Sequence, residues 1–139
     1  MASGISVDDE CAAAWVALQA GHKHSYVIFK ISDDKKKIEV DCKGEPGEPY
    51  QSLREKLKQK GACRYAVMDF EYDPVKKAKK TVFIAWVPDD CSIKEKMLYA
   101  SSKQAMKDKL TGFGKEIQAN DDDELDEKHL MEKCCSKYD

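Results

Sequence analysis

The alternation of apolar and polar positions predicts strands and helices that interleave along the whole chain. Short runs rich in β-branched and aromatic residues predict strands, and apolar residues at helical spacing predict helices. The expected strands are 25–31, 38–42, 63–70, 81–87 and 116–119, and the expected helices are 7–20, 49–60, 93–111 and 120–136. The strand at 81–87 is apolar almost throughout, so we expect it inside the sheet.

Capping and helix-breaking residues place the helix ends. Ser6 followed by Asp9 matches a capping box, which predicts the start of the first helix. Pro49 fits the first position of the second helix, and Gly61 stops it. Residues 120–123 are expected to cap the last helix. Without repeats or low-complexity linkers, this order predicts a single α/β domain, with a central mixed β-sheet sandwiched between α-helices.

The long helix expected at 93–111 has apolar residues on two sides. At about 100° per residue, one side holds Tyr99, Met106 and Leu110, and a nearly opposite side holds Ile93, Met97 and Ala100. A helix on a sheet needs one apolar stripe, so the second must pack on another helix or meet a partner. Five lysines stand against two acids in this helix: Lys94, Lys96, Lys103, Lys107 and Lys109 against Glu95 and Asp108. Lysines around an exposed methionine favour an acidic protein partner.

Length and composition indicate a soluble globular chain. Its 139 residues suffice for one domain with a real core, and it is 42% hydrophobic and 36% charged. No apolar run approaches the ~18 residues of a membrane span. The N-terminus lacks an apolar stretch behind basic residues, so we expect no signal peptide and a location in the cytoplasm or nucleus. The net charge of −2 points to no partner class.

The cysteines predict neither a disulfide framework nor a metal site. They are Cys11, Cys42, Cys63, Cys91, Cys134 and Cys135. In a reducing compartment most are expected to be small core residues with free thiols. There is no C-x-x-C pair, so neither zinc nor thioredoxin chemistry is favoured. Cys134 and Cys135 are able to oxidise or to bind a soft metal, but we expect solvated or half-buried thiols there. No metal and no cofactor is predicted.

The catalytic motifs that we looked for are missing from the sequence. The histidines at 22, 24 and 129 have no triad arrangement around a nucleophile. Neither a P-loop nor G-x-G-x-x-G occurs. Residues 121–124 lack the glycine and the bidentate acid of a calcium loop. The lysines come without aromatic stacking residues, which argues against nucleic-acid binding. The sequence therefore predicts a binding protein and not an enzyme.

Residues 86–103 read WVPDDCSIKEKMLYASSK. The elements W-x-P-D, K-x-K-M and Y-A-S-S-K, in this order and without a gap, resemble the segment of the ADF/cofilin family that grips actin. The resemblance covers essentially the whole chain, including Ser3, Gly4, Ile5, Val7, Gly21, His22, Arg64, Tyr65, Ala66, Asp69, Ile117, Gln118 and Ala119. It implies one ADF-homology domain over 1–139, with residues 1–6 as a mobile N-terminal arm.

The resemblance also implies two sets of actin contacts. The positions that match contacts with the actin monomer are Ser3, Gly4, Ile5, Lys94, Lys96, Met97 and Ser102. The positions that match contacts with a second actin subunit in the filament are Lys79, Lys80, Glu132 and Lys133. Phosphorylation of the serine that corresponds to Ser3 abolishes binding in the family, since a phosphate adds about two negative charges. Ala78 and Ser136 stand where members often carry basic residues, which bears on severing strength.

The function implied is that of a monomeric protein that binds actin monomers and filaments and promotes filament depolymerisation and severing. Two alternatives stay open. The lysine-rich helix and the lysine-rich 73–80 hairpin would also suit a sensor of phosphoinositide lipids on a membrane surface. Alternatively, the chain would be a monomer-only, actin-sequestering relative with weak severing.

Overall fold

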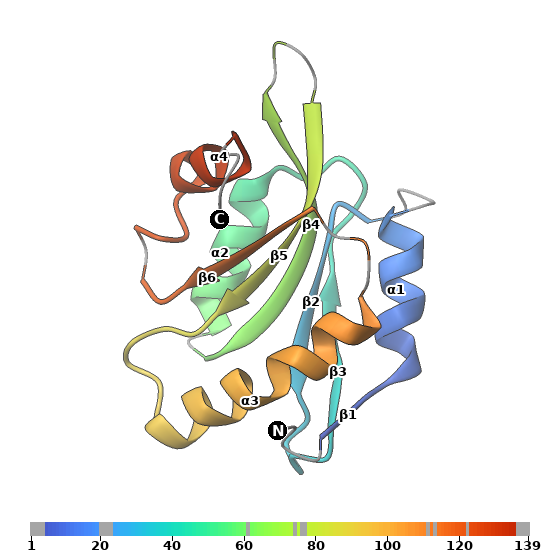
Figure 1. Ribbon diagram of the computed structural model, residues 1–139, viewed down its shortest axis with the longest axis vertical. Coiled ribbons are helices and arrows are strands. Elements are labelled where there is room, and N and C mark those ends of the chain that lie inside the picture. Colours follow the sequence, from blue (N-terminus) through green and yellow to red (C-terminus); the bar gives the residue numbers. More distant parts are fainter. Residues whose placement is uncertain are drawn as a thin grey trace.

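The computed structural model describes residues 5–19, 24–60, 62–73, 75, 78–110, 112, 114–121 and 123–135. Within these ranges the chain forms a six-stranded mixed sheet with the order β1-β3-β2-β4-β5-β6 (Figure 1). The strands are β1 (Ser6–Val7), β2 (Tyr26–Ile31), β3 (Lys37–Lys43), β4 (Arg64–Asp73), β5 (Ala78–Trp86) and β6 (Lys115–Ala119). The pairs β1–β3 and β5–β6 are parallel, and the other neighbours are antiparallel.

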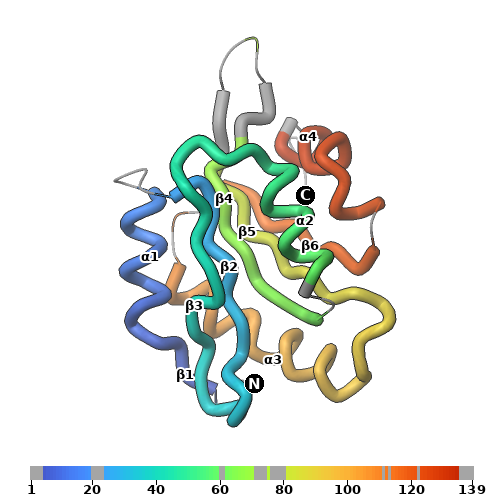
Figure 2. The backbone as a smooth tube through the Cα atoms, turned by 180° about the vertical axis from the view of Figure 1, so that it is seen from behind, coloured from blue at the N-terminus to red at the C-terminus, as the bar shows by residue number. Residues whose placement is uncertain are grey.

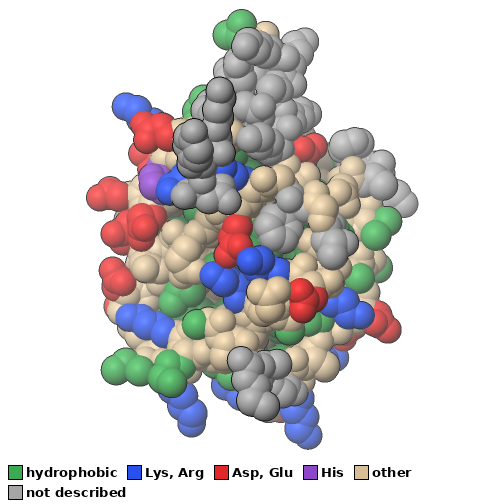
Figure 3. All heavy atoms as spheres, viewed as in Figure 1, with side chains coloured by type: hydrophobic (Ala, Val, Ile, Leu, Met, Phe, Trp, Pro, Cys, Tyr) green, Lys and Arg blue, Asp and Glu red, His purple; other side chains and the backbone are tan. Residues whose placement is uncertain are grey.

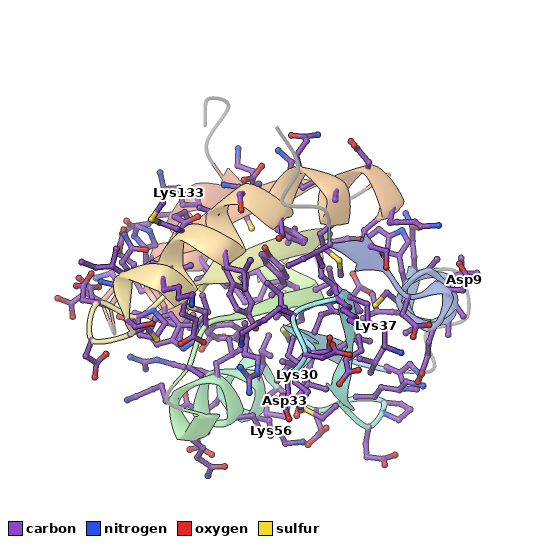
Figure 4. The ribbon with its side chains drawn as sticks, turned by 90° about the horizontal axis from the view of Figure 1, so that it is seen from below. Asp9, Lys30, Asp33, Lys37, Lys56 and Lys133 are labelled. Carbon is purple, nitrogen blue, oxygen red and sulfur yellow. The ribbon has the colours of Figure 1, made fainter. Side chains whose placement is uncertain are left out.

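Helices cover both faces of this sheet. They are α1 (Asp9–Gln19), α2 (Tyr50–Lys60), α3 (Ile93–Lys109) and α4 (Glu127–Cys135). Buried residues of α1 and α3 share one core cluster, and those of α2 and α4 share another with the opposite face. The view from below shows α3 and α2 on opposite sides of the sheet (Figure 4), and the rear view shows α2 crossing in front of it (Figure 2). The predicted α/β sandwich is confirmed.

The interior strands are apolar on both faces because both faces are covered. The segment 82–86 of β5 is buried throughout and lies between β4 and β6, as expected for a continuous apolar run. In β2, Val27 and Phe29 point into one cluster, whereas Ile28 points into the other. This alternation fixes the register, since a one-residue slip would exchange the two sets.

The first helix is capped by a different residue from the one that the sequence predicted. The carboxylate of Asp8 accepts a hydrogen bond from the Glu10 N–H at 3.0 Å, as an N-cap side chain does. Ser6 instead lies in β1, paired with Lys37 of β3. The Ser6–Asp9 capping box is therefore wrong, because sheet pairing takes the backbone of Ser6. A two-residue strand is too short to show any periodicity in the sequence.

The last helix begins later than expected. The side chains of Asp121 and Glu124 close a separate turn: Asp121 accepts a hydrogen bond from the Glu124 N–H at 2.9 Å, and Glu124 accepts one from the Asn120 N–H at 3.0 Å. Leu125 then enters the core, and α4 begins at Glu127. The capping chemistry at 120–123 was correctly identified, but it stabilises a turn before the helix. The sequence could not show that burial of Leu125 redirects the chain.

Cysteines contribute to both core clusters. Cys11 and Cys63 are fully buried and free, which confirms the expectation for them. Cys134 is also buried, at 1% exposure, so the half-exposed thiol expected there is wrong. Its position on α4 faces the sheet beside Leu130. The side chain of Cys135 lies outside the described part of the chain. No helix in the described ranges is both long and apolar enough to cross a membrane.

Candidate functional site

The start of α3 is fixed by its cap and by the loop before it. The hydroxyl of Ser92 accepts a hydrogen bond from the Glu95 N–H at 3.1 Å, which satisfies one free donor of the first turn. The Lys96 ammonium reaches back to the carbonyl oxygen of Asp89 at 2.5 Å. These two contacts hold the first turn of α3 against the loop that connects it to β5.

The helix presents two different faces, as its sequence predicts. Tyr99, Met106 and Leu110 are at most 3% exposed and pack against the sheet. On the other side Ile93 is 76% exposed and Met97 66%. Because burial of apolar surface is favourable, two large apolar side chains left in water on adjacent turns indicate a surface for a partner.

Tyr99 anchors the inner face of α3. Its hydroxyl accepts a hydrogen bond from the buried Ile31 N–H at 2.9 Å, and its carbonyl oxygen accepts one from the Tyr65 hydroxyl. The rings of Tyr65 and Tyr99 pack with centroids 5.1 Å apart. Burial raises the pKa of both hydroxyls, so both stay neutral near pH 7. The exposed face is therefore carried on a firmly anchored helix.

An open groove of about 560 Å³ lies beside the exposed face. Its lining residues are Lys35, Ser92, Lys94, Glu95, Met97, Leu98 and Ser101. Lys35 comes from the β2–β3 turn, where its backbone has a left-handed φ of 62°. The groove thus joins an apolar strip with two lysines from distant parts of the chain. Sequence reasoning missed Lys35 and Leu98, because nothing local places the β2–β3 turn next to α3.

The lysines of α3 fall into two groups. Lys103 and Lys107 form ion pairs with Glu116 of β6 at 3.0 and 2.6 Å. Partial burial alone would raise the pKa of Glu116, but the hydrogen bonds from Lys107 and Lys103 outweigh it and lower this pKa. Lys94 is exposed and forms no ion pair within the described ranges. Exposed hydrophobic and basic side chains lie together over the N-terminal part of α3, at the lower edge of Figure 3.

The N-terminal segment enters the domain beside α3. Ile5 is 6% exposed in the core that α1 and α3 share, and Ser6 belongs to β1. Ile5 and Ser6, the two described residues of the predicted arm 1–6, therefore belong to the folded domain: Ile5 packs in the core and Ser6 pairs with β3. The buried Ile5 side chain is not at the surface. Ser3 and Gly4 lie outside the described residues.

Ser102 is also buried, although it was predicted to contact the actin monomer. Its side chain is fully buried on the inner face of α3. Of the α3 residues predicted to contact the monomer, Lys94 and Met97 are exposed and Lys96 is partly exposed.

The second predicted contact region lies at the other end of the molecule from α3 (Figure 1). Lys79 and Lys80 belong to β5, in the hairpin with β4 that projects beyond the sheet; their side chains lie outside the described part. Glu132 and Lys133 are exposed on α4, which packs against β4 near the base of this hairpin. The fold therefore brings the hairpin and α4 to one end, separate from the groove.

Comparisons with known proteins identify the family of the chain. Residues 4–135 match the family described as cofilin/tropomyosin-type actin-binding protein. The chain is 37% identical over 132 residues to actophorin from Acanthamoeba castellanii, covering 94% of this chain and 95% of the relative. It is 40% identical over 139 residues to cofilin from Gibberella zeae, covering 89% of each. The crystal structure of Streptomyces griseoflavus cofilin superposes with a TM-score of 0.87 and 32% identity, covering 95% of this chain and 98% of that one. The chain belongs to the ADF/cofilin family of actin-binding proteins.

Proposed function

We propose that this chain binds actin monomers and filaments and promotes the depolymerisation and severing of filaments. Family membership supports actin binding. The single observation that carries the proposal for this chain is the outer face of α3. Ile93 and Met97 stay in water there beside Lys94, which forms no ion pair in the part of the chain that the structure describes. Tyr99 anchors this helix to the sheet.

The physical basis of monomer binding is a small apolar contact with a basic rim. Met97 and Ile93 would enter an apolar cleft of the partner, and methionine adapts its shape to such a cleft. Lys94 and Lys35 would face acidic groups and speed encounter by electrostatic steering. Because the helix is already capped and anchored, little conformational entropy is lost on binding.

The segment before Ile5 would extend this surface. Ser3 comes two residues before Ile5 in the sequence, and Ile5 packs in the core cluster that α3 shares. A phosphate there would add roughly 1.5–2 negative charges where an acidic partner approaches. We therefore propose Ser3 as the site of a phosphorylation that weakens binding. Ser3→Asp should weaken it partly and Ser3→Ala should not; equal affinities of the two variants would contradict this role.

Filament binding would use the opposite end of the domain. Lys79 and Lys80 of the hairpin, with Glu132 and Lys133 of α4, would contact a second actin subunit. A protein that binds two subunits better in one filament twist shifts the filament towards that twist. Strained contacts between subunits would then break more easily, which is how binding without catalysis would lead to severing.

Monomer binding is tested with Lys94→Ala. Lys96 is not chosen because its side chain also donates a hydrogen bond to the Asp89 carbonyl oxygen, so replacing it would also disturb the loop before α3. The matched control is Lys58→Ala, an exposed lysine on α2 across the sheet. We expect Lys94→Ala to weaken binding of labelled actin monomers about tenfold, or about 1.4 kcal/mol, and the control to leave it unchanged. Equal affinities for both variants would rule out this surface.

Severing is tested by watching single labelled filaments while the protein is titrated in. The variant with Lys79→Ala and Lys80→Ala should lose filament binding and severing but keep monomer affinity. Only a filament offers a second subunit to that end of the domain. Equal loss of monomer and filament binding would mean one continuous actin surface instead of two. Normal monomer binding by the parent protein without severing would identify the monomer-only alternative.

The phosphoinositide alternative would use the lysines of α3 and of the 73–80 hairpin. Two of them, Lys103 and Lys107, already neutralise Glu116, which reduces the charge that α3 offers to a lipid surface. Vesicles with and without phosphoinositide, compared with actin co-sedimentation, separate the two functions. Strong vesicle binding without actin binding would favour the lipid role.

A further inference from the structure

Two thiols and a carboxylate converge next to the first turn of α3. Cys63 lies just before β4, Cys91 lies in the loop before α3, and Glu95 lies in the first turn of that helix. The two sulfur atoms and a carboxylate oxygen all lie within 4.8 Å of one another. Cys63 is fully buried, whereas Cys91 and Glu95 are partly exposed. Neither cysteine takes part in the proposed actin contacts, although Glu95 also lines the groove.

The orientation of Glu95 departs from what its local sequence favours. Ser92 and Glu95 match a capping box, in which the glutamate side chain would return to the N–H of the cap residue. Instead, the Glu95 carboxylate accepts a hydrogen bond from the backbone N–H of Cys63 at 3.2 Å. This bond directs the carboxylate onto the thiol pair, in the way that outer hydrogen bonds orient the ligands of metal sites.

The charged side chains around the thiols leave room for a cation. The Glu95 carboxylate lies against both sulfur atoms. The guanidinium of Arg64, the residue after Cys63, is held by the Asp41 carboxylate, with Nε and the carboxylate oxygen 3.1 Å apart. A divalent ion would compensate two thiolates next to a carboxylate, and each thiol would release its proton to solvent on binding.

We propose that Cys63, Cys91 and Glu95 bind one zinc ion, with water in the fourth position. Zinc accepts thiolate and carboxylate ligands in a tetrahedral site, whereas magnesium and calcium require oxygen ligands. Bonds of about 2.0–2.3 Å place tetrahedral ligand atoms roughly 3.3–3.8 Å apart, so small side-chain rotations would close the present triangle. The partly exposed Cys91 gives the ion an entry path. The bound ion would tie the first turn of α3 to the start of β4.

The ligands could not be recognised from sequence spacing. Cys63 precedes β4 and Cys91 lies in the loop between β5 and α3, and the two form no C-x-x-C motif. Their meeting depends on the pairing of β4 with β5, which places Arg64 opposite Trp86. The residue after Cys63 and the end of the strand that leads to Cys91 thus lie side by side in the sheet.

The test uses the full chain, kept reduced with a phosphine and without actin, so that its outcome is independent of the proposed function. The chain is equilibrated with Zn²⁺ and, as a spectroscopic probe, with Co²⁺. We expect one ion per chain, a sulfur-to-cobalt charge-transfer band, and a Tm that rises with free zinc. Cys91→Ser should abolish the band, and Glu95→Gln should weaken zinc binding at least about tenfold, since ligand geometry and charge are both lost.

Matched controls separate this site from the other thiols. Cys42 is partly exposed on the opposite face of the sheet, so Cys42→Ser should bind zinc like the parent. Cys135→Ser tests the adjacent cysteines Cys134 and Cys135 in the same way, and this variant should also bind zinc like the parent. Circular dichroism establishes that each variant folds. If Cys91→Ser does not fold, the zinc affinity of Glu95→Gln tests the site in its place. Absence of the band in the parent chain, its survival in Cys91→Ser, or an unchanged zinc affinity in Glu95→Gln would overturn the proposal. A reduced chain that binds no zinc but forms a Cys63–Cys91 disulfide with a thiol oxidant would also overturn it.

Discussion

The two faces of α3 carry similar residue types with opposite roles. Met106 on the inner face is fully buried, whereas Met97 on the outer face is 66% exposed. Lys107 pairs with Glu116 of β6 at 2.6 Å, whereas Lys94 meets no acidic side chain within the described ranges. Residue type therefore does not decide the role. Position relative to the sheet decides whether a methionine packs in the core and whether a lysine finds a partner inside its own chain.

This comparison shows how an interface can be inferred from what the fold leaves over. Tyr99 and Met106 of the inner stripe are buried against the sheet. Lys103 and Lys107 form ion pairs with Glu116 of β6. What remains is the apolar and basic strip around Met97. A helix needs one apolar stripe for its own packing, so the second stripe is surplus to folding and available for binding. The predictions below test this division of roles.

The largest expected effect comes from the same substitution made on each face. Met106→Ala should destabilise the fold by about 2–5 kcal/mol, because it leaves a cavity in the core. Met97→Ala should change stability by less than about 0.5 kcal/mol but weaken actin binding. Urea unfolding of the two variants, with actin binding measured in parallel, checks this. Similar stability losses would show that the outer face also packs in the fold.

The next effect concerns the anchor of the inner face. Tyr99→Phe keeps the ring but removes the acceptor for the buried Ile31 N–H. Leaving a buried donor unsatisfied should cost about 1–3 kcal/mol. The measurement is the free energy of unfolding, together with amide hydrogen exchange at Ile31. If that amide exchanges no faster in the variant, the hydrogen bond does not hold α3 to the sheet.

A smaller effect separates the two groups of lysines. Lys107→Ala should lower stability by about 0.2–1 kcal/mol, because its pair with Glu116 is partly exposed. Lys94→Ala should leave stability unchanged. Actin affinity should respond in the opposite way, falling in Lys94→Ala and holding in Lys107→Ala. A loss of actin affinity in both variants would extend the binding surface to the C-terminal half of α3.

The smallest effect is a pH dependence at Glu116. Its pKa in the folded protein lies below the ordinary value of 4.5, so the folded state favours the ionised form. This contribution to stability is present above about pH 4.5, and it is lost as the pH falls through the lowered folded pKa. Glu116→Gln should remove this part of the acid dependence, as measured by unfolding between neutral and acid pH. An unchanged acid profile would mean that the lysine pairs are too well solvated to matter.

The parts of the fold that the sequence predicted are those with a strong local signal. The interior strands and α3 have long apolar runs or clear helical spacing, and their bounds were found within a few residues. β1 was missed because its pairing partner is β3, which lies far away in the sequence. The start of α4 was misplaced because a local turn competes with the helix for the same capping acids.

The candidate site divides in the same way. The outer stripe with Ile93 and Met97 was predicted correctly, because helical periodicity places residues on a face without any knowledge of the sheet. Ser102 was placed at the surface by resemblance, yet it is buried. Helical spacing places Ser102 three residues after Tyr99 and four before Met106, hence on the inner face, so periodicity agrees with the observed burial where the resemblance does not.

The sequence by itself determined the fold class, the family and the two-faced character of α3, since each depends on residues that are close along the chain. Only the tertiary structure decided which lysines are neutralised, which turn lies beside Met97, and that Cys63, Cys91 and Glu95 meet. The physical reason is the range of the forces involved. Ion pairs, thiol clusters and grooves need atoms within a few ångströms, and strand pairing sets which distant segments come that close.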